Sequence, residues 1–155
     1  MELNFRINLT KKQKEAYNLL HDDDTKVLVA RWSRQSGKTV FCEIVILNYL
    51  FTPRSQNAYI SPTYAQGRKV YKELVNLLSS HPSVAGYVQS TNASTLTITM
   101  KNGAVLQFFS AESPTAIRGY TVRGLCVIDE AAFLPDQLSD GSDIWANVIY
   151  PIIKA

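Results

Sequence analysis

The chain has 155 residues, of which 46% are hydrophobic and 19% are charged, and its formal net charge is +3. This length fits one domain, and the hydrophobic content is enough for a core, so a disordered tail or a collagen-like repeat is excluded. The longest hydrophobic stretch, residues 41–51, is interrupted by Glu43 and Asn48, and the start of the chain has no signal-peptide core, so neither secretion nor membrane spanning is supported.

The first part of the chain is predicted to alternate helices and strands. Thr10 is the expected N-cap of a helix that runs through Leu20. The apolar run 26–31 predicts a buried strand, residues 32–36 a polar loop, and residues 37–50 a helix. A polar loop is therefore expected between a buried strand and a helix.

A second strand and an amphipathic helix are predicted next. Residues 57–61 read as the strand, and Pro62 breaks it before a helix over residues 64–78. The apolar side of this helix carries Val70, Leu74, Leu77 and Leu78.

A hairpin is expected after this helix. Residues 95–100 alternate between polar and apolar side chains, as a strand with one buried face does. Asn102 and Gly103 are the pair that supplies the positive φ angles of a type I′ turn, and residues 104–109 form the returning strand.

The last predicted elements are one strand and one helix. Residues 125–128 are fully apolar and end on Asp129 and Glu130, and residues 142–150 look helical before Pro151.

The order of these elements indicates the fold class. Alternating strands and helices with continuous apolar strands predict an α/β fold with a mostly parallel sheet, helices on both faces, and an antiparallel hairpin near residues 95–109. No repeat or linker-like run appears, so residues 1–155 are expected to form one domain.

Charge is distributed unevenly along the chain. Residues 1–125 carry 15 basic and 8 acidic residues, whereas residues 126–155 carry 1 basic and 5 acidic residues. The basic part could attract polyanions such as ATP or DNA, or it could be a solvated surface. Arg68, Lys69 and Lys72 could meet a DNA backbone, but from the sequence we favour a solvated helix face.

The two cysteines, Cys42 and Cys126, lie inside apolar runs and are too few for a disulfide framework or a metal cluster. A reducing compartment is the default expectation.

The sequence SRQSGKT, residues 33–39, carries the clearest chemistry. A phosphate group requires backbone N–H donors, a helix N-terminus, a lysine for the β and γ oxygens, and a hydroxyl for Mg²⁺. Trp32 stands where the consensus GxxxxGK[ST] has its first glycine, so a chance Gly-Lys-Thr at the start of a helix is the alternative. The candidate nucleotide-binding residues are Ser33, Arg34, Gln35, Ser36, Gly37, Lys38 and Thr39.

Asp129 and Glu130 form a second candidate site at the carboxyl end of a predicted strand, where open parallel sheets bind ligands. One carboxylate could hold Mg²⁺ and the other could polarise an attacking water. Either residue alone could belong to a solvated turn or begin a helix. The two motifs together, in this order, predict a nucleoside triphosphate site that uses Mg²⁺ as cofactor.

Arg34 lies inside the phosphate loop and has two possible roles. Its guanidinium could stabilise charge near the γ-phosphate as an arginine finger supplied in cis, or it could pair with an acidic neighbour. Its position among the loop amides favours the first role.

These motifs resemble the ATPase domain of the large terminase subunit, the DNA-packaging motor of tailed bacteriophages. SRQ before Gly-Lys-Thr is that family's own form of the Walker A motif, and VIDEAAF, residues 127–133, resembles its Walker B motif. Residues 108–133 resemble the stretch that leads into Walker B, and residues 58–74 resemble the strand and helix after Walker A. LTKKQK, residues 9–14, resembles the adenine-side segment of the family.

The resemblance implies a P-loop NTPase of the additional-strand, catalytic-glutamate type. Carried over residue by residue, it implies Lys38 and Thr39 on phosphate and Mg²⁺, Arg34 as in-loop arginine, Asp129 on Mg²⁺, Glu130 as catalytic carboxylate, and Gln13 at the adenine-side glutamine. Arg118 could sense nucleotide, stabilise the loop before Walker B, or be a structural arginine.

The resemblance further implies Mg²⁺-dependent ATP hydrolysis that drives double-stranded DNA into a procapsid. The implied partners are a portal protein, a small terminase subunit and further copies of the chain in a ring, with no membrane, in the cytoplasm of the host cell. Large terminases continue into a coupling motif and a nuclease domain, so we expect an incomplete ATPase domain without nuclease activity. A missing strand would leave a sheet edge exposed and favour marginal stability or self-association.

Two other functions remain open from the sequence. A helicase-like DExx ATPase shares an acidic strand end and a glutamine before the first motif. A non-catalytic fragment that binds ATP or serves in assembly would bind Mg-ATP without turnover.

Overall fold

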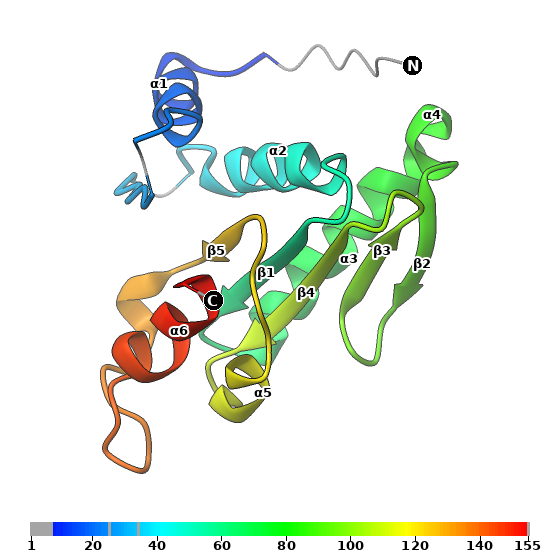
Figure 1. Ribbon diagram of the computed structural model, residues 1–155. Helices are drawn as coiled ribbons and strands as arrows, with labels where there is room; N and C mark the ends of the chain where they lie inside the picture. Colours follow the sequence, from blue (N-terminus) through cyan, green and yellow to red (C-terminus); the bar gives the residue numbers. More distant parts are fainter. Residues whose placement is uncertain (1–7, 25, 34, 155) are drawn as a thin grey trace. The chain divides into compact units, whose positions relative to one another are not determined.

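The computed structural model describes residues 8–24, 26–33 and 35–154 (Figure 1). The chain divides into two compact units, residues 1–45 and 46–155, and each is described by itself. Among the described residues, no helix combines the length and the hydrophobicity needed to cross a membrane.

The first unit contains helix α1 (Lys11–Leu20) and the start of helix α2 (Lys38–Leu50), which continues into the second unit. Thr10 caps α1 as predicted: its hydroxyl accepts a hydrogen bond from the Gln13 N–H, and its own N–H donates to Gln13 Oε1 at 2.9 Å. Such a reciprocal pair satisfies two N–H groups that the first turn of a helix leaves without partners. The bounds predicted for both helices are confirmed to within one residue.

The strand predicted over residues 26–31 is wrong. These residues form neither helix nor strand, and Val27 and Val29 are 61% and 83% exposed. A strand requires a neighbour that pairs with its N–H and C=O groups. The apolar composition of the run alone therefore does not make it a strand.

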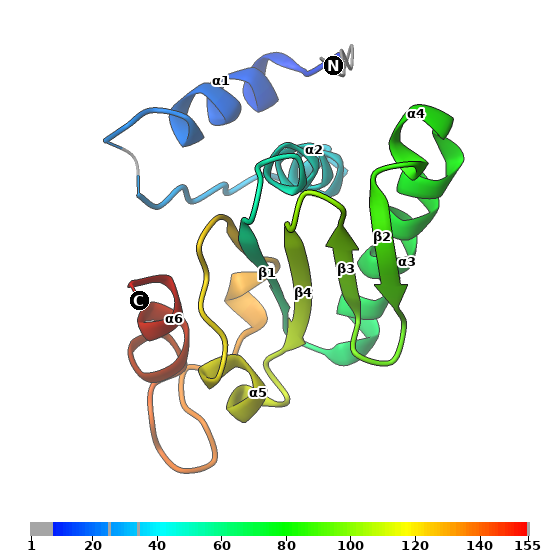
Figure 2. The same cartoon turned by 45° about the vertical axis from the view of Figure 1, so that its right-hand side comes forward.

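The second unit is built on a five-stranded sheet with the order β2-β3-β4-β1-β5 (Figure 2). The strands are β1 (Gln56–Ser61), β2 (Val88–Asn92), β3 (Thr97–Met100), β4 (Val105–Ser110) and β5 (Cys126–Ile128). β1 runs parallel to β4 and β5, whereas β3 is antiparallel to both β2 and β4. The described sheet is therefore mixed rather than mostly parallel, because the hairpin extends into a third antiparallel strand, β2.

The helical segments of the second unit are, besides the end of α2, α3 (Tyr64–Ser80), α4 (Pro82–Ala85), α5 (Pro114–Arg118), η1 (Ala131–Phe133), η2 (Trp145–Ile149) and α6 (Tyr150–Lys154). α3 confirms the predicted amphipathic helix. Its buried stripe consists of Gly67, Val70, Tyr71, Leu74 and Leu78.

The alternation of β1 separates two packed layers. Successive side chains of a strand point to opposite faces, and Ala58 and Ile60 pack into one cluster with residues of α5, η2 and α6. Tyr59 points the other way, where its ring lies 5.1 Å from that of Phe108, which also meets Tyr71 of α3. Helices thus cover both faces of the sheet, as predicted, with α3 opposite α5 and α6 (Figure 2).

The β3–β4 hairpin is confirmed, but its turn differs from the predicted type I′ turn. Among Asn102 and Gly103, only Gly103 has a positive φ, +84°. The Met100 N–H donates to the Ala104 carbonyl, so three residues form the loop, with the glycine in the left-handed position. Asn102 instead uses its side chain, which donates to the Leu50 carbonyl and accepts from the Ala104 N–H.

The last helical segment begins later than predicted and does not end before Pro151. The π-helix η2 leads directly into α6, and Pro151 lies in the first turn of α6. A proline ring lacks an N–H and clashes with the carbonyl one turn earlier in a regular α-helix. The wider π-helical turn just before it accommodates the ring.

Candidate functional site

The phosphate-loop candidates lie at the start of α2. Gly37 has φ +80° and Gln35 has φ +57°, both in the left-handed region, and the helix begins at Lys38. The positive φ favours glycine at position 37, and a Cβ there would also stand 2.7 Å from Gln13 Nε2, whose side chain would have to shift. The first-turn N–H groups of a helix have no partners within the helix, which is the arrangement that binds anions.

Side chains close the loop in front of the helix. Lys38 Nζ donates to the Trp32 carbonyl at 3.2 Å, and Ser36 Oγ donates to the Ser33 carbonyl at 2.6 Å. Thr39 is exposed in the first turn of α2. Arg34, the predicted in-loop arginine, lies outside the described residues.

Gln13 links α1 to this loop. Its side chain is buried, and Nε2 donates to the Gly37 carbonyl at 3.0 Å while Oε1 accepts from the Thr10 N–H. The sequence predicts Gln13 on the adenine side of a nucleotide. In this structure its carboxamide is bonded to the helix cap and to the phosphate loop.

The acidic candidates lie at the carboxyl end of β5. The Tyr59 hydroxyl, on a nearly fully buried side chain, donates to Asp129 Oδ2 at 2.7 Å. The Glu130 N–H donates to Asp129 Oδ1 at 2.9 Å. Both oxygens of Asp129 therefore accept hydrogen bonds that fix the orientation of its carboxylate.

Glu130 is held by a different element. Its backbone is in the left-handed region with φ 48°, and Gln66 Nε2 donates to its Oε2 at 3.0 Å. Gln66 belongs to the capping box of α3, in which the Thr63 hydroxyl accepts from the Gln66 N–H. The first turn of α3 thus positions the second acidic side chain.

Sequence reasoning missed both Tyr59 and Gln66. Tyr59 stands inside an apolar strand, where its ring predicts core packing and nothing in the sequence indicates a carboxylate partner. Thr63 followed three residues later by Gln66 is a recognisable helix-start pattern, but this pattern does not identify Glu130 as the second contact.

The predicted oxygen donors suit Mg²⁺. Mg²⁺ prefers hard oxygen ligands and usually binds one or two carboxylates together with waters and substrate phosphates. Asp129, Glu130 and the Thr39 hydroxyl are donors of this kind. The part of the chain that the structure describes contains no cluster of three or more His, Cys, Asp or Glu side chains.

Arg118 belongs to a separate network. Its Nη2 donates to Ser142 Oγ at 3.2 Å and lies 3.5 Å from Asp140 Oδ2. Hydrogen bonds from Ser142, and then the Arg118 charge, lower the pKa of Asp140. Arg118 makes no hydrogen bond or ion pair with Asp129 or Glu130, and its predicted sensor role stays a prediction.

The chain is similar to solved phage proteins. The large terminase ATPase domain of Thermus phage P74-26 is 22% identical with a TM-score of 0.68, and the match covers 96% of this chain and 66% of that one. An arginine-to-alanine mutant of that domain is 23% identical with a TM-score of 0.63, covering 78% and 52%. The large terminase of bacteriophage HK97 is 15% identical with a TM-score of 0.66, covering 81% and 34%.

These solved structures support the α/β fold, and the chain spans between 34% and 66% of their lengths. No curated protein sequence matches the chain. The family described as the N-terminal part of the terminase large subunit, T4likevirus-type, matches residues 30–139. Because this match covers more than half of the sequence, the chain belongs to the large terminase subunit family.

Proposed function

We propose that this chain is the ATP-binding and ATP-hydrolysing part of a DNA-packaging motor, with the P-loop NTPase arrangement of the additional-strand, catalytic-glutamate type. The observation that carries the proposal is the pair Asp129 and Glu130 at the end of β5, with one carboxylate bonded to Tyr59 and the other to Gln66. Membership of the large terminase family supports the same activity.

The phosphate loop would bind the triphosphate. The first-turn N–H groups of α2 would donate to phosphate oxygens, and Lys38 would exchange its bond to the Trp32 carbonyl for one to the β or γ oxygens. Arg34 would add a second positive charge near the γ-phosphate. Ser33, Gln35 and Ser36 would complete the loop that surrounds the phosphates.

Thr39 and Asp129 would hold Mg²⁺ through a hydroxyl and a carboxylate oxygen. When bound with ATP, Mg²⁺ neutralises charge on the phosphate oxygens as the terminal phosphoryl group is transferred. The Tyr59 hydroxyl keeps the Asp129 carboxylate in one orientation, which favours a fixed ligand position.

Glu130 would orient the attacking water in line with the leaving group and accept its proton. Gln66 bonds to Oε2 of this carboxylate, so Oε1 is available for the water. Gln66 is therefore a positioning residue for Glu130 rather than a catalytic one.

In the complete motor, hydrolysis would drive double-stranded DNA into a procapsid in the host cell cytoplasm. The proposed partners are a portal protein, a small terminase subunit and further copies of the chain in a homo-oligomeric ring. Arg118 would serve as a nucleotide sensor, and Gln13 would act on the adenine side or through its bond to the Gly37 carbonyl.

The test is Mg²⁺-dependent phosphate release from ATP by the chain and by three variants. Glu130→Gln should keep ATP binding and lower turnover by roughly 10²- to 10⁴-fold, the usual contribution of a general base. Lys38→Ala should weaken ATP binding itself. Glu73→Gln removes an exposed carboxylate from α3 and should leave both unchanged. Equal turnover in the chain and in Glu130→Gln would contradict the assigned role.

One observation favours a second function, a non-catalytic ATP-binding module. Residues 26–31, which precede the phosphate loop, form neither helix nor strand, so no regular element leads into the loop from that side. Tight Mg-ATP binding that requires Lys38, without phosphate release, would support this alternative. The family match is to the terminase large subunit, and no observation specifically favours the alternative of a helicase-like ATPase.

A further inference from the structure

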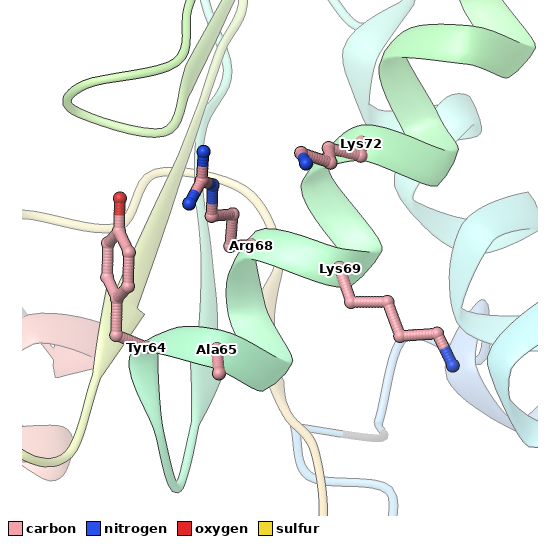
Figure 3. Close-up of a pocket in the computed structure, with 5 residues that line it drawn as sticks. All are labelled: Tyr64, Ala65, Arg68, Lys69 and Lys72. Atoms are coloured by element: carbon pink, nitrogen blue, oxygen red, sulfur yellow. The ribbon is translucent and has the colours of Figure 1, made fainter.

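Three cations gather on the exposed side of α3. Arg68, Lys69 and Lys72 lie with Tyr64 and Ala65 around a shallow depression on this helix (Figure 3). We call these five residues the α3 basic surface.

The helix periodicity produces this surface. The buried stripe of α3 faces the sheet, so the residues between its members, including Arg68, Lys69 and Lys72, face solvent. Tyr64, Arg68 and Lys72 are four residues apart, which places them along one side of the helix at intervals of about 6 Å. Figure 3 shows the Tyr64 and Arg68 side chains side by side, Lys72 extending toward Arg68, and Lys69 pointing away.

Within the described part of the chain, no acidic side chain forms an ion pair with these cations. The ion pair found there joins Arg118 and Asp140. Glu73 follows Lys72 directly but forms no ion pair with Arg68, Lys69 or Lys72. The surface therefore presents three unpaired positive charges on one and a half turns of helix, more than a mixed solvated face requires.

The shape of the depression favours a polymer over a small ligand. Ala65 also lines the depression, and its single methyl group is too small to cover the helix backbone. All the lining residues come from one helix, so nothing encloses a ligand, whereas small-molecule sites bury most of their ligand. A chain of regularly spaced anions lying along this side of the helix could contact Arg68, Lys72 and the Tyr64 hydroxyl.

We propose that the α3 basic surface binds the sugar-phosphate backbone of double-stranded DNA, an inference that rests on the proposed packaging function. A motor that moves a genome has to hold every sequence, and phosphate contacts carry no sequence information. Lysine, arginine and tyrosine hydroxyl groups are the usual donors to phosphate oxygens. The surface offers these donors and no pocket that would read a base.

The experiment is fluorescence anisotropy of the full 155-residue chain with a labelled duplex of about 30 base pairs at several NaCl concentrations. The double variant Arg68→Gln, Lys72→Gln should reduce the magnitude of the negative slope of log Kobs against log[NaCl] by roughly 1.8, because each lost phosphate contact removes about 0.9. At about 50 mM NaCl the affinity should fall on the order of 10- to 100-fold.

Two further variants control for fold and charge. Lys101→Gln removes one exposed cation from the β3–β4 turn, outside the α3 basic surface. It should change the affinity and the slope only by the small amount expected from lowering the net charge by one. Arg68→Lys, Lys72→Arg preserves the charges and should bind as the original chain does. Equal thermal midpoints for all variants verify that each is folded.

The inference is overturned if the original chain does not bind the duplex, or if the double variant binds with unchanged affinity and slope. It is also overturned if the double substitution abolishes binding to phosphatidylserine vesicles but not to DNA, since the surface would then be a lipid site. Mg-ATP binding and turnover are measured on the same samples. If the double variant loses DNA affinity and keeps ATP turnover, the proposed DNA-binding role of the α3 basic surface is supported. If the original chain binds DNA through this surface but does not bind ATP, the proposed ATPase function is contradicted and the DNA-binding role is not.

Discussion

Tyr59 is a buried residue that forms a hydrogen bond with the candidate site residue Asp129. Its ring packs in the core while its hydroxyl donates to Asp129 Oδ2. Tyr59→Phe keeps the ring and removes this bond to a charged acceptor. We expect the free energy of unfolding to fall by about 1.5–3 kcal/mol, measured by urea denaturation.

Tyr71→Phe is the matched control, because Tyr71 is a buried ring in the same aromatic cluster and its hydroxyl has no hydrogen bond within the described residues. Its unfolding free energy should change by less than about 0.5 kcal/mol. Equal losses in both variants would show that the bond to Asp129 contributes nothing specific. If Tyr59→Phe also raises the Mg²⁺ concentration needed for half-maximal turnover, the positioning role is supported.

The burial of Cys126 can be tested by the rate at which its thiol is alkylated. Desolvation raises the pKa of the Cys126 thiol from 9.0 to about 11. Only the thiolate reacts with alkylating reagents, so in a Cys42→Ser background the folded chain should react at about pH 8 roughly 100-fold more slowly than the urea-unfolded chain. The measurement is the rate of iodoacetamide labelling.

The same pKa shift fixes the sign of a pH effect on stability. Between about pH 9 and 11 the unfolded chain loses the Cys126 proton while the folded chain keeps it, so the unfolding free energy should fall as pH rises through this window. Below this window the contribution is fully present. Cys126→Ala should show a smaller fall than the original thiol in this window, and an identical pH profile would contradict the raised pKa.

The contact of α3 with the sheet depends on a glycine. A Cβ on Gly67 would stand 2.8 Å from Ser61 Oγ, which is buried and donates to the Thr63 carbonyl. Gly67→Ala should therefore lower the unfolding free energy by about 1–3 kcal/mol, although alanine is the better helix former. Thermal and urea denaturation measure the change.

Gly86 is the matched control, since its φ is −62° and a Cβ added there would meet no described atom within 4 Å. Gly86→Ala should be neutral or stabilising by up to about 1 kcal/mol. If Gly67→Ala were also neutral, α3 would have room to move away from β1, and Gln66 would lose its fixed position.

Elements with strong local signals are the ones that the sequence predicted correctly. α1 and α3 follow threonine N-caps with capping boxes, β5 is a continuous apolar run, and β1 carries Ala58, Tyr59 and Ile60 at its centre. The elements that were missed are short: α4 and α5 have four and five residues, and β2 is mostly exposed. Short elements are stabilised by their packing rather than by a periodic pattern, so the sequence alone does not predict them.

For the whole molecule, we expect the apolar run before the phosphate loop to promote self-association. Val29 is 83% exposed in a run that forms neither helix nor strand, and exposed apolar segments with unpaired backbone groups can add to strands of other copies. Val29→Lys should weaken self-association roughly tenfold, which corresponds to about 1.4 kcal/mol. Sedimentation velocity at several concentrations provides the measurement.

Leu19→Lys is the control, because Leu19 is 53% exposed but lies on helix α1 and not in the strand-like run. It should leave the sedimentation profile unchanged. A strictly monomeric original chain, or equal effects of the two substitutions, would contradict a role for this run.

The residue types of the candidate site, its two motifs and their order follow from the sequence itself, because short-range patterns specify helix starts, apolar strands and the groups that suit phosphate and Mg²⁺. The tertiary structure decided which strands pair and which side chains meet. Tyr59 reaches Asp129 across 70 residues and Gln66 reaches Glu130 across 64. Such contacts exist only once β1, α3 and β5 pack together. The run 26–31 shows the converse, because a strand-like composition does not by itself make a strand.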